Sequence, residues 1–152
     1  MKYPLKIGIW GCMLKNHKII FEFYENTINS DKYIKIICNN IIPLISKNSN
    51  LLFQQDNASC HVSNKTITFF ARNNVEIMIW PPNSPDLNPI ENCWYLLKKR
   101  IGLVYCKNKE EFKKIIKDAL DNFEIEIINK LTDSMNNRIV ELFKKDFNSI
   151  NY

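Results

Sequence analysis

The chain has 152 residues, of which 45% are hydrophobic and 24% charged, a globular composition with enough length for one hydrophobic core. Its net charge of +5 is spread along the sequence, so it permits a polyanionic partner without identifying one. The five cysteines form no Cys-x-x-Cys pair and no apolar run approaches ~18 residues, so we expect neither a disulfide framework nor a signal peptide or membrane span.

The first predicted elements are two strands and a helix. Residues 5–14 and 18–24 are rich in β-branched and aromatic side chains and flank a polar turn, which predicts an antiparallel pair. Residues 30–42 have apolar side chains at helical spacing, and Ser30 and Asp31 are suitable caps for the start of that helix. A proline and a Ser/Asn-rich stretch follow and are expected to end it.

A strand, a helix and a second strand are predicted next. Residues 51–55 form a short strand that delivers Asp56 at its carboxyl end, residues 63–73 form a helix, and residues 75–80 form the second strand. A helix between two strands favours a parallel pair with a crossover connection.

The rest of the chain is predicted to be helical. After a loop at 81–89, Asn88 caps a helix that has Pro89 at its first position, and beyond Gly102 two amphipathic helices follow. We expect one domain, with a strand–helix core at 1–101 and a helical tail at 102–152.

Two carboxylates occupy unusual places in this pattern. Asp56 directly follows a strand, and Glu91 lies in the first turn of a helix behind a proline-rich loop. Carboxylates that converge at the carboxyl ends of strands can bind Mg²⁺, which prefers oxygen ligands. Each has a plain alternative: Asp56 as a turn residue, and Glu91 as part of a capping box that bonds back to the Asn88 backbone.

The sequences around both carboxylates carry a specific signal. Residues 54–61 read QQDNASCH and residues 80–94 read WPPNSPDLNPIENCW, and 34 residues, positions 57 to 90, separate Asp56 from Glu91. Both strings and this interval resemble the segments around the last two catalytic carboxylates of Tc/mariner transposases. Trp10-Gly11-Cys12 and the string at 134–138, SMNNR, resemble flanking segments of the same family.

This resemblance implies an α/β fold of the RNase H-like class, with a mixed sheet flanked by helices, and cut-and-paste DNA transposition driven by Mg²⁺ or Mn²⁺. Asp56 and Glu91 would be the catalytic metal ligands. The partners would be DNA, as transposon ends and target, and a second copy of the chain in a homodimer. No membrane or small-molecule partner is implied, and in a eukaryote the protein would work in the nucleus.

The chain also departs from the family pattern. The family's first aspartate lies on a central strand upstream of the Trp10 segment, and no residue here matches it. Glu22, Glu25 and Asp31 are the only acidic residues before Asp56, and their predicted positions do not suit that role. The family's N-terminal helix-turn-helix domain has no counterpart either. We therefore expect a transposase-derived catalytic-domain fragment that is inactive as this chain alone.

Other residues could contribute to such a site. His61 could contact a phosphate or only pack, and the cations Lys98, Lys99 and Arg100 could contact DNA or only complement a helix dipole. A soft-metal site at Cys60, His61 and Cys93 is disfavoured because adjacent ligands are geometrically awkward. Asp86 is interpreted as a loop or capping residue.

Three functions stay open at this point. The first is the transposase fragment described above. The second is a catalytically dead module, derived from a transposase, that binds nucleic acid or another protein. The third is a different RNase H-like nuclease, which the two motif strings disfavour.

Overall fold

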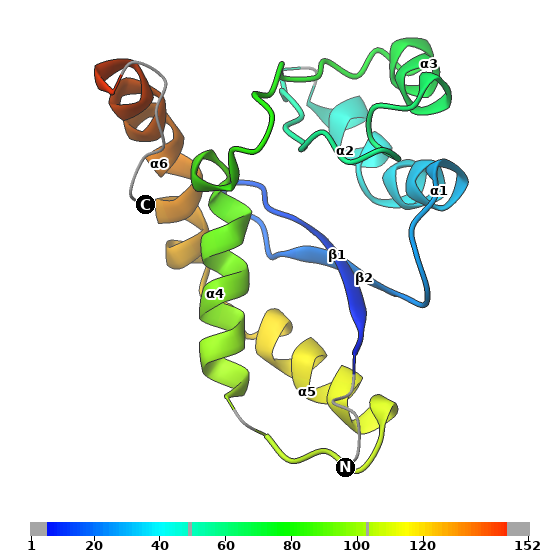
Figure 1. Ribbon diagram of the computed structural model, residues 1–152, viewed down its shortest axis with the longest axis vertical. Coiled ribbons are helices and arrows are strands. Elements are labelled where there is room, and N and C mark those ends of the chain that lie inside the picture. The colour runs from blue at the N-terminus through cyan, green and yellow to red at the C-terminus, as the bar shows by residue number, and fades with distance from the viewer. Residues whose placement is uncertain (1–5, 49, 103, 146–152) are drawn as a thin grey trace. The chain divides into compact units, whose positions relative to one another are not determined.

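The computed structural model describes residues 6–48, 50–102 and 104–145 (Figure 1). Residue 5 of the first predicted strand and residues 146–152 of the predicted tail lie outside the described residues. The elements in chain order are β1 (Gly8–Cys12), β2 (Ile20–Tyr24), α1 (Ser30–Asn40), α2 (Ile42–Lys47), α3 (Asn64–Arg72), the short 3₁₀ helix η1 (Pro85–Leu87), α4 (Pro89–Ile101), α5 (Lys109–Asp121) and α6 (Ile125–Lys144).

The chain folds as two compact units. The first, which we call the hairpin unit, consists of Met1–Glu25 and Ser84–Tyr152; the second, the bridge unit, is Asn26–Asn83. Helices α5 and α6 pack against α4 within the hairpin unit. None of the described helices is long and apolar enough to cross a membrane.

The hairpin at the start of the chain is confirmed. Strands β1 and β2 pair antiparallel with Ile9 opposite Phe23. The polar turn between them places Asn16 at a φ of 64°, and the His17 N–H donates to the Leu14 carbonyl at 3.1 Å. Asparagine tolerates this left-handed conformation better than most residues, so the Lys-Asn-His turn suits a tight reversal.

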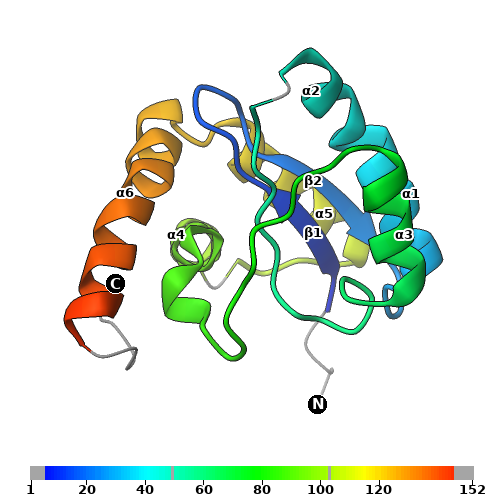
Figure 2. The ribbon, with the colours of Figure 1, turned by 90° about the horizontal axis from the view of Figure 1, so that it is seen from above.

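One face of the hairpin joins the main core. Alternation along the strands puts Ile9, Phe21 and Phe23 on the same face, and they pack against a buried cluster from α4, α5 and α6. Figure 2 shows the ribbons of the hairpin and of these three helices. The fully enclosed members are Cys93, Leu97, Ile116, Leu120, Phe123 and Ile128, with Ile19 beside them. Helices α4, α5 and α6 therefore form the layer on which the hairpin rests.

The bridge unit contains the parallel pair in a reduced form. Phe53 and Ile77 form a single parallel bridge, in which Phe53 N–H donates to the Glu76 carbonyl at 2.8 Å and Met78 N–H to the Phe53 carbonyl at 2.9 Å. The direction that we predicted is confirmed, but the strands are shorter than predicted. The ladder stops because neighbouring groups have other partners: Leu51 N–H donates to Asn48, and the Asn57 side chain, rather than its backbone, reaches Trp80.

The first helix differs from the prediction at both ends. Its cap is Asn29, whose side chain accepts from Lys32 N–H, rather than Ser30 or Asp31. Helix α1 ends at Asn40, and Pro43 does not end helical structure because it lies in the first turn of α2. Proline is tolerated there, since the first amides of a helix have no intrahelical partner.

Candidate functional site

Asp56 lies on the loop that follows the parallel bridge of the bridge unit. Its Oδ1 accepts from the Ala58 N–H at 3.0 Å and lies 2.6 Å from His61 Nδ1, while 59% of the side chain is exposed. The bond to Ala58 is the turn contact that we considered as the plain role of Asp56. Both contacts use Oδ1 and so fix the carboxylate, and among the described residues Oδ2 has no hydrogen-bond partner.

His61 is in turn held by its surroundings. Its ring lies 4.2 Å from that of Tyr33, and the buried Tyr33 hydroxyl donates to Gln55 Oε1 at 2.5 Å. Gln55 Nε2 then donates to the His61 carbonyl at 3.3 Å. The contacts run from Tyr33 through Gln55 and His61 to Asp56, so the carboxylate is oriented by a closed set of side chains.

The loop that carries His61 is also fastened to α3. The buried Thr66 hydroxyl donates to the Cys60 carbonyl at 2.6 Å, and Ser63 caps α3 by accepting from Thr66 N–H at 3.2 Å. The sequence allowed this helix to start at Ser63 or Asn64, and the structure has Ser63 as the cap and Asn64 as the first helical residue. Thr66 therefore links the helix directly to the residue before His61.

Glu91 lies in the first turn of α4, in the hairpin unit. The Asn88 cap and Pro89 stand where we predicted, with Asn88 Oδ1 accepting from Ile90 N–H at 3.3 Å. The capping-box interpretation of Glu91 is wrong, because the Asn88 N–H donates to the Pro85 carbonyl at 3.0 Å instead. The Glu91 side chain is exposed, and its carboxylate makes no hydrogen bond or ion pair within the described ranges.

The family model for DDE superfamily endonucleases matches residues 6–114, well over half of the chain and inclusive of both carboxylates. The chain belongs to this family. Among its relatives, the Tc3 transposase of Caenorhabditis elegans is 33% identical over 96% of this chain and 46% of its own length. The Tc1 transposase of the same organism is 30% identical over 87% of this chain and 49% of its own. The Tc/mariner resemblance is thereby confirmed, and the chain spans about half the length of these curated relatives.

Solved structures identify the fold. The Mos1 mariner paired end complex with Mn aligns with a TM-score of 0.85 at 16% identity, over 99% of this chain and 48% of that one. The catalytic domain of Mos1 mariner transposase aligns with a TM-score of 0.76 at 14% identity, over 95% and 82%. The chain thus has the fold of a transposase catalytic domain, which confirms the predicted RNase H-like α/β class.

The three cations at the C-terminal end of α4 differ in their contacts. Arg100 forms an ion pair with Glu124, and its guanidinium lies 4.4 Å from the centre of the Phe123 ring. The Arg100 hydrogen bond lowers the pKa of Glu124. Lys98 and Lys99 are exposed, and among the described residues neither has a carboxylate within 4.0 Å. Arg100 therefore serves the fold, and the two lysines are open to solvent.

Burial affects the thiols of Cys60 and Cys93, the two cysteines beside the carboxylate motifs. Burial raises the pKa of the Cys93 thiol to about 12, and burial is also the main reason that the pKa of Cys60 is raised. A soft metal needs thiolates. No group of three or more His, Cys, Asp or Glu side chains in the part of the chain that the structure describes could hold a metal ion by itself.

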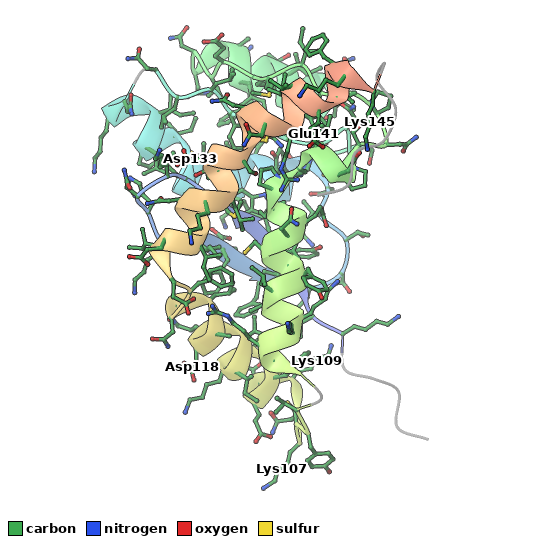
Figure 3. All side chains as sticks on the ribbon, turned by 90° about the vertical axis from the view of Figure 1, so that its left-hand side faces the viewer. Lys107, Lys109, Asp118, Asp133, Glu141 and Lys145 are labelled. Atoms are coloured by element: carbon green, nitrogen blue, oxygen red, sulfur yellow. The ribbon has the colours of Figure 1, made fainter. Side chains whose placement is uncertain are left out.

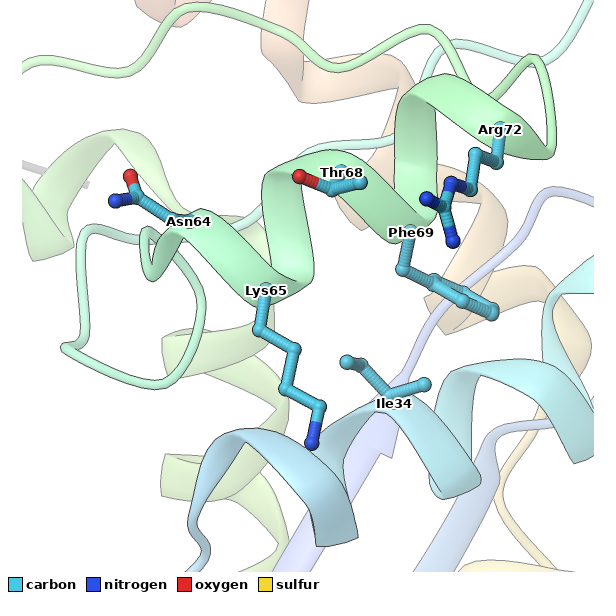
Figure 4. Close-up of a pocket in the computed structure, with 6 residues that line it drawn as sticks. All are labelled: Ile34, Asn64, Lys65, Thr68, Phe69 and Arg72. Atoms are coloured by element: carbon cyan, nitrogen blue, oxygen red, sulfur yellow. The ribbon is translucent and has the colours of Figure 1, made fainter.

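A hollow on the bridge unit lies apart from Asp56 and His61. It is open and mostly apolar, and it lies between α1 and α3 (Figure 4). Its lining residues are Ile34, Asn64, Lys65, Thr68, Phe69 and Arg72. Lys65 at its rim pairs with Asp31. The hollow presents no oxygen-rich cluster, so its chemistry differs from that of the carboxylate loop.

Sequence analysis missed Arg138, which is 1% exposed and is the largest fully buried side chain among the described residues. The signal was available, because Leu131, Met135, Arg138 and Leu142 recur at the four- and three-residue spacing of one helix face. A cation within an otherwise apolar stripe requires hydrogen-bonding partners inside the protein. Arg138 donates to Asp86 and Asn92, both within the string at 80–94 that carries Glu91.

Proposed function

We propose that this chain supplies part of the catalytic centre of a Tc/mariner-type DNA transposase, with Asp56 and Glu91 as ligands of Mg²⁺ or Mn²⁺. The observation that carries the proposal is the state of the two carboxylates. Asp56 is fixed through one oxygen and Glu91 is exposed without a competing partner within the described residues. Family membership and the metal-containing complexes of Mos1 support the same assignment.

The residues fit a hard divalent cation. Both donors are carboxylate oxygens, the ligands that Mg²⁺ and Mn²⁺ prefer over sulfur. When bound, such ions activate a water or a 3′-hydroxyl and stabilise the leaving oxygen in phosphodiester chemistry. The task of the protein is then to hold its carboxylates in place.

The residues around the two carboxylates and at the C-terminal end of α4 also have roles in this proposal. His61 donates from Nδ1 to Asp56 Oδ1 and so keeps the carboxylate turned, which leaves Nε2 as the nitrogen available to a DNA phosphate. The positive end of the α4 dipole stabilises the charge of Glu91. Lys98 and Lys99 would contact DNA phosphates at the other end of α4, while Arg100 holds Glu124.

The remaining parts of the proposal follow from the family. The DNA would be the transposon ends and the target, the outcome of strand transfer would be DNA integration, and the working form would be a homodimer. In a eukaryote this chemistry belongs in the nucleus. Because only two motif carboxylates lie in this chain, we expect the purified 152-residue protein not to cleave DNA. Mg²⁺-dependent cleavage that Asp56→Ala abolishes would contradict this expectation.

Metal binding can be tested with Mn²⁺ alone, by measuring free Mn²⁺ with electron paramagnetic resonance during a titration of the chain. Asp56→Asn and Glu91→Gln should each weaken binding by about tenfold or more, since each removes a charged ligand. Asp118→Asn is the matched control, because Asp118 is exposed on α5 (Figure 3). Equal affinity in all four proteins would contradict the proposal.

A second candidate is a DNA-binding module without catalysis, which the open side chains of Lys98 and Lys99 favour. In that case Lys98→Gln and Lys99→Gln would lower DNA affinity and reduce its dependence on salt by about one unit of slope each. Binding in the presence of a chelator that Asp56→Asn and Glu91→Gln leave unchanged would favour this candidate.

A further inference from the structure

Arg138 connects three parts of the hairpin unit through its guanidinium group. Nε donates to Ser134 Oγ at 2.9 Å, one turn earlier on α6. Nη1 donates to the carbonyl of Asp86 in η1 at 2.5 Å, and Nη2 donates to Asn92 Oδ1 on α4 at 2.7 Å. All three nitrogens of one buried side chain are thus engaged with different acceptors.

The acceptors lie on both sides of Glu91 in the sequence. Asp86 belongs to the 3₁₀ turn that leads into the Asn88 cap, and Asn92 directly follows Glu91 in the first turn of α4. A shift of either segment would break a bond to the same guanidinium. The direction in which α4 presents Glu91 therefore depends on Arg138.

Arginine suits this task for physical reasons. Its guanidinium is planar, stays protonated and offers five N–H donors in a rigid fork, whereas a lysine ammonium is a point charge on a flexible stem. A buried cation is costly unless its hydrogen bonds are satisfied, so the acceptors and the arginine depend on one another. Ser134 adds the contact that fixes the fork to α6.

We propose that Arg138 is a positioning residue, which holds η1 and the first turn of α4 so that Glu91 stays oriented as a metal ligand. This inference rests on the proposed function for the metal part of its claim. It also assigns a role to the SMNNR string at 134–138: Ser134 holds Arg138, and Arg138 bonds to the string at 80–94. The contact from Nη1 to Asp86 is made with its backbone carbonyl.

Hydrogen exchange of the metal-free chain tests the positioning itself. The amides of Leu87, Asn88 and Glu91 are bonded within the turn and helix start, to Ser84, Pro85 and Asn88 respectively. In Arg138→Lys these amides should exchange about tenfold faster or more, while those of the core residues Leu120 and Ile128 stay unchanged. Arg72→Lys, the same replacement at an exposed arginine of the bridge unit, should change neither group.

A second variant keeps the test decisive if Arg138→Lys does not fold. Asn92→Ala removes one of the three acceptors and leaves the arginine in place, and it should raise exchange at the same three amides. Faster exchange throughout the core in both variants, or no change at Glu91, would overturn the proposal, since Arg138 would then be a general stabilising residue or irrelevant to α4.

Mn²⁺ affinity tests the consequence for the site. Arg138→Lys should weaken Mn²⁺ binding by about 10- to 100-fold, the usual effect of removing a residue that orients a ligand. Selective loosening of α4 with unchanged affinity would overturn the positioning role. If the unaltered chain binds no Mn²⁺, the proposed function fails, and the exchange result still decides whether Arg138 holds the helix start.

Discussion

The two candidate metal ligands are held in different ways. Asp56 lies on a loop of the bridge unit, and side chains orient it directly, above all His61 at 2.6 Å. Glu91 lies on a helix of the hairpin unit, and the Asn88 cap and the bonds of Arg138 to the Asp86 carbonyl and the Asn92 side chain hold the start of that helix. A loop carboxylate needs contacts to its own oxygens, whereas a helical carboxylate takes its direction from the helix.

This difference predicts that substitutions near one carboxylate will leave the other unaffected. The bridge unit should respond most to the loss of the buried ring beneath His61. The hairpin unit should lose stability when residues are substituted at the contact between β1 and α4 or at the start of α4. Each of the following predictions tests whether the surroundings of Asp56 and Glu91 respond independently.

The largest effect is expected for Tyr33→Ala. Tyr33 is 1% exposed and contacts both His61 and Phe70, so removing its ring should lower the free energy of unfolding by about 3–5 kcal/mol in urea titrations. Amide signals near Asp56 should shift, and those of the first turn of α4 should not. Tyr33→Phe is the control, because it keeps the ring and removes the hydroxyl that donates to Gln55, and it should cost about 0.5–1.5 kcal/mol. Shifts of equal size in the amide signals around Glu91 would contradict the independence of the two carboxylates.

A smaller effect is expected for Gly11→Ala, which acts on the hairpin unit. A Cβ at this position would lie 2.5 Å from the Trp94 ring on α4, so the ring must move. We expect a loss of about 1–3 kcal/mol in the free energy of unfolding. In a Trp94→Leu background the same change should cost less. A cost that is independent of Trp94 would show that the contact between β1 and α4 is not the cause.

The next effect is expected at the helix cap. Asn88→Ala removes the acceptor for Ile90 N–H and should cost about 1 kcal/mol, whereas Asn88→Asp should retain most of the stability. Thermal unfolding measures the cost. Exchange at Glu91 should rise in the alanine variant while amides near His61 stay unchanged. A change confined to His61 would contradict the separation of the two neighbourhoods.

The smallest effect concerns the far end of α4 and depends on pH. Arg100 lowers the pKa of Glu124 in the folded chain, so their pair stabilises the protein above the unfolded pKa of about 4.3 and loses this effect as pH falls through the folded pKa. Wild type should therefore have a higher melting temperature than Glu124→Gln at pH 7, and this difference should disappear as the pH falls through the lowered pKa of Glu124. A gap that persists in acid would assign the stabilisation to packing.

Much of this molecule could be predicted from local sequence. The hairpin, the Ser63 and Asn88 caps and the tail helices follow from patterns that act within a few residues. Asp56 and Glu91 were identified by the strings around them, and family membership confirmed those strings while leaving the metal role a proposal. The parallel pair was predicted in direction but not in length, since the length depends on partners distant in sequence.

The parts that sequence could not supply depend on tertiary contacts. Arg138 lies 52 residues from Asp86 and 46 from Asn92, so no local pattern could pair them. The Glu91 capping box failed because Asn88 N–H bonds to Pro85 in a 3₁₀ turn that was predicted only as loop.

The central claim is that Asp56 and Glu91 are the divalent-metal ligands of this chain. Its most direct test is a Mn²⁺ titration followed by the paramagnetic broadening of backbone amide signals. At the lowest Mn²⁺ concentrations we predict broadening around Asp56 and around Glu91, before the acidic first turn of α5 with Glu110 and Glu111 responds. Broadening that begins at Glu110 and Glu111, or that spares either Asp56 or Glu91, would contradict the account.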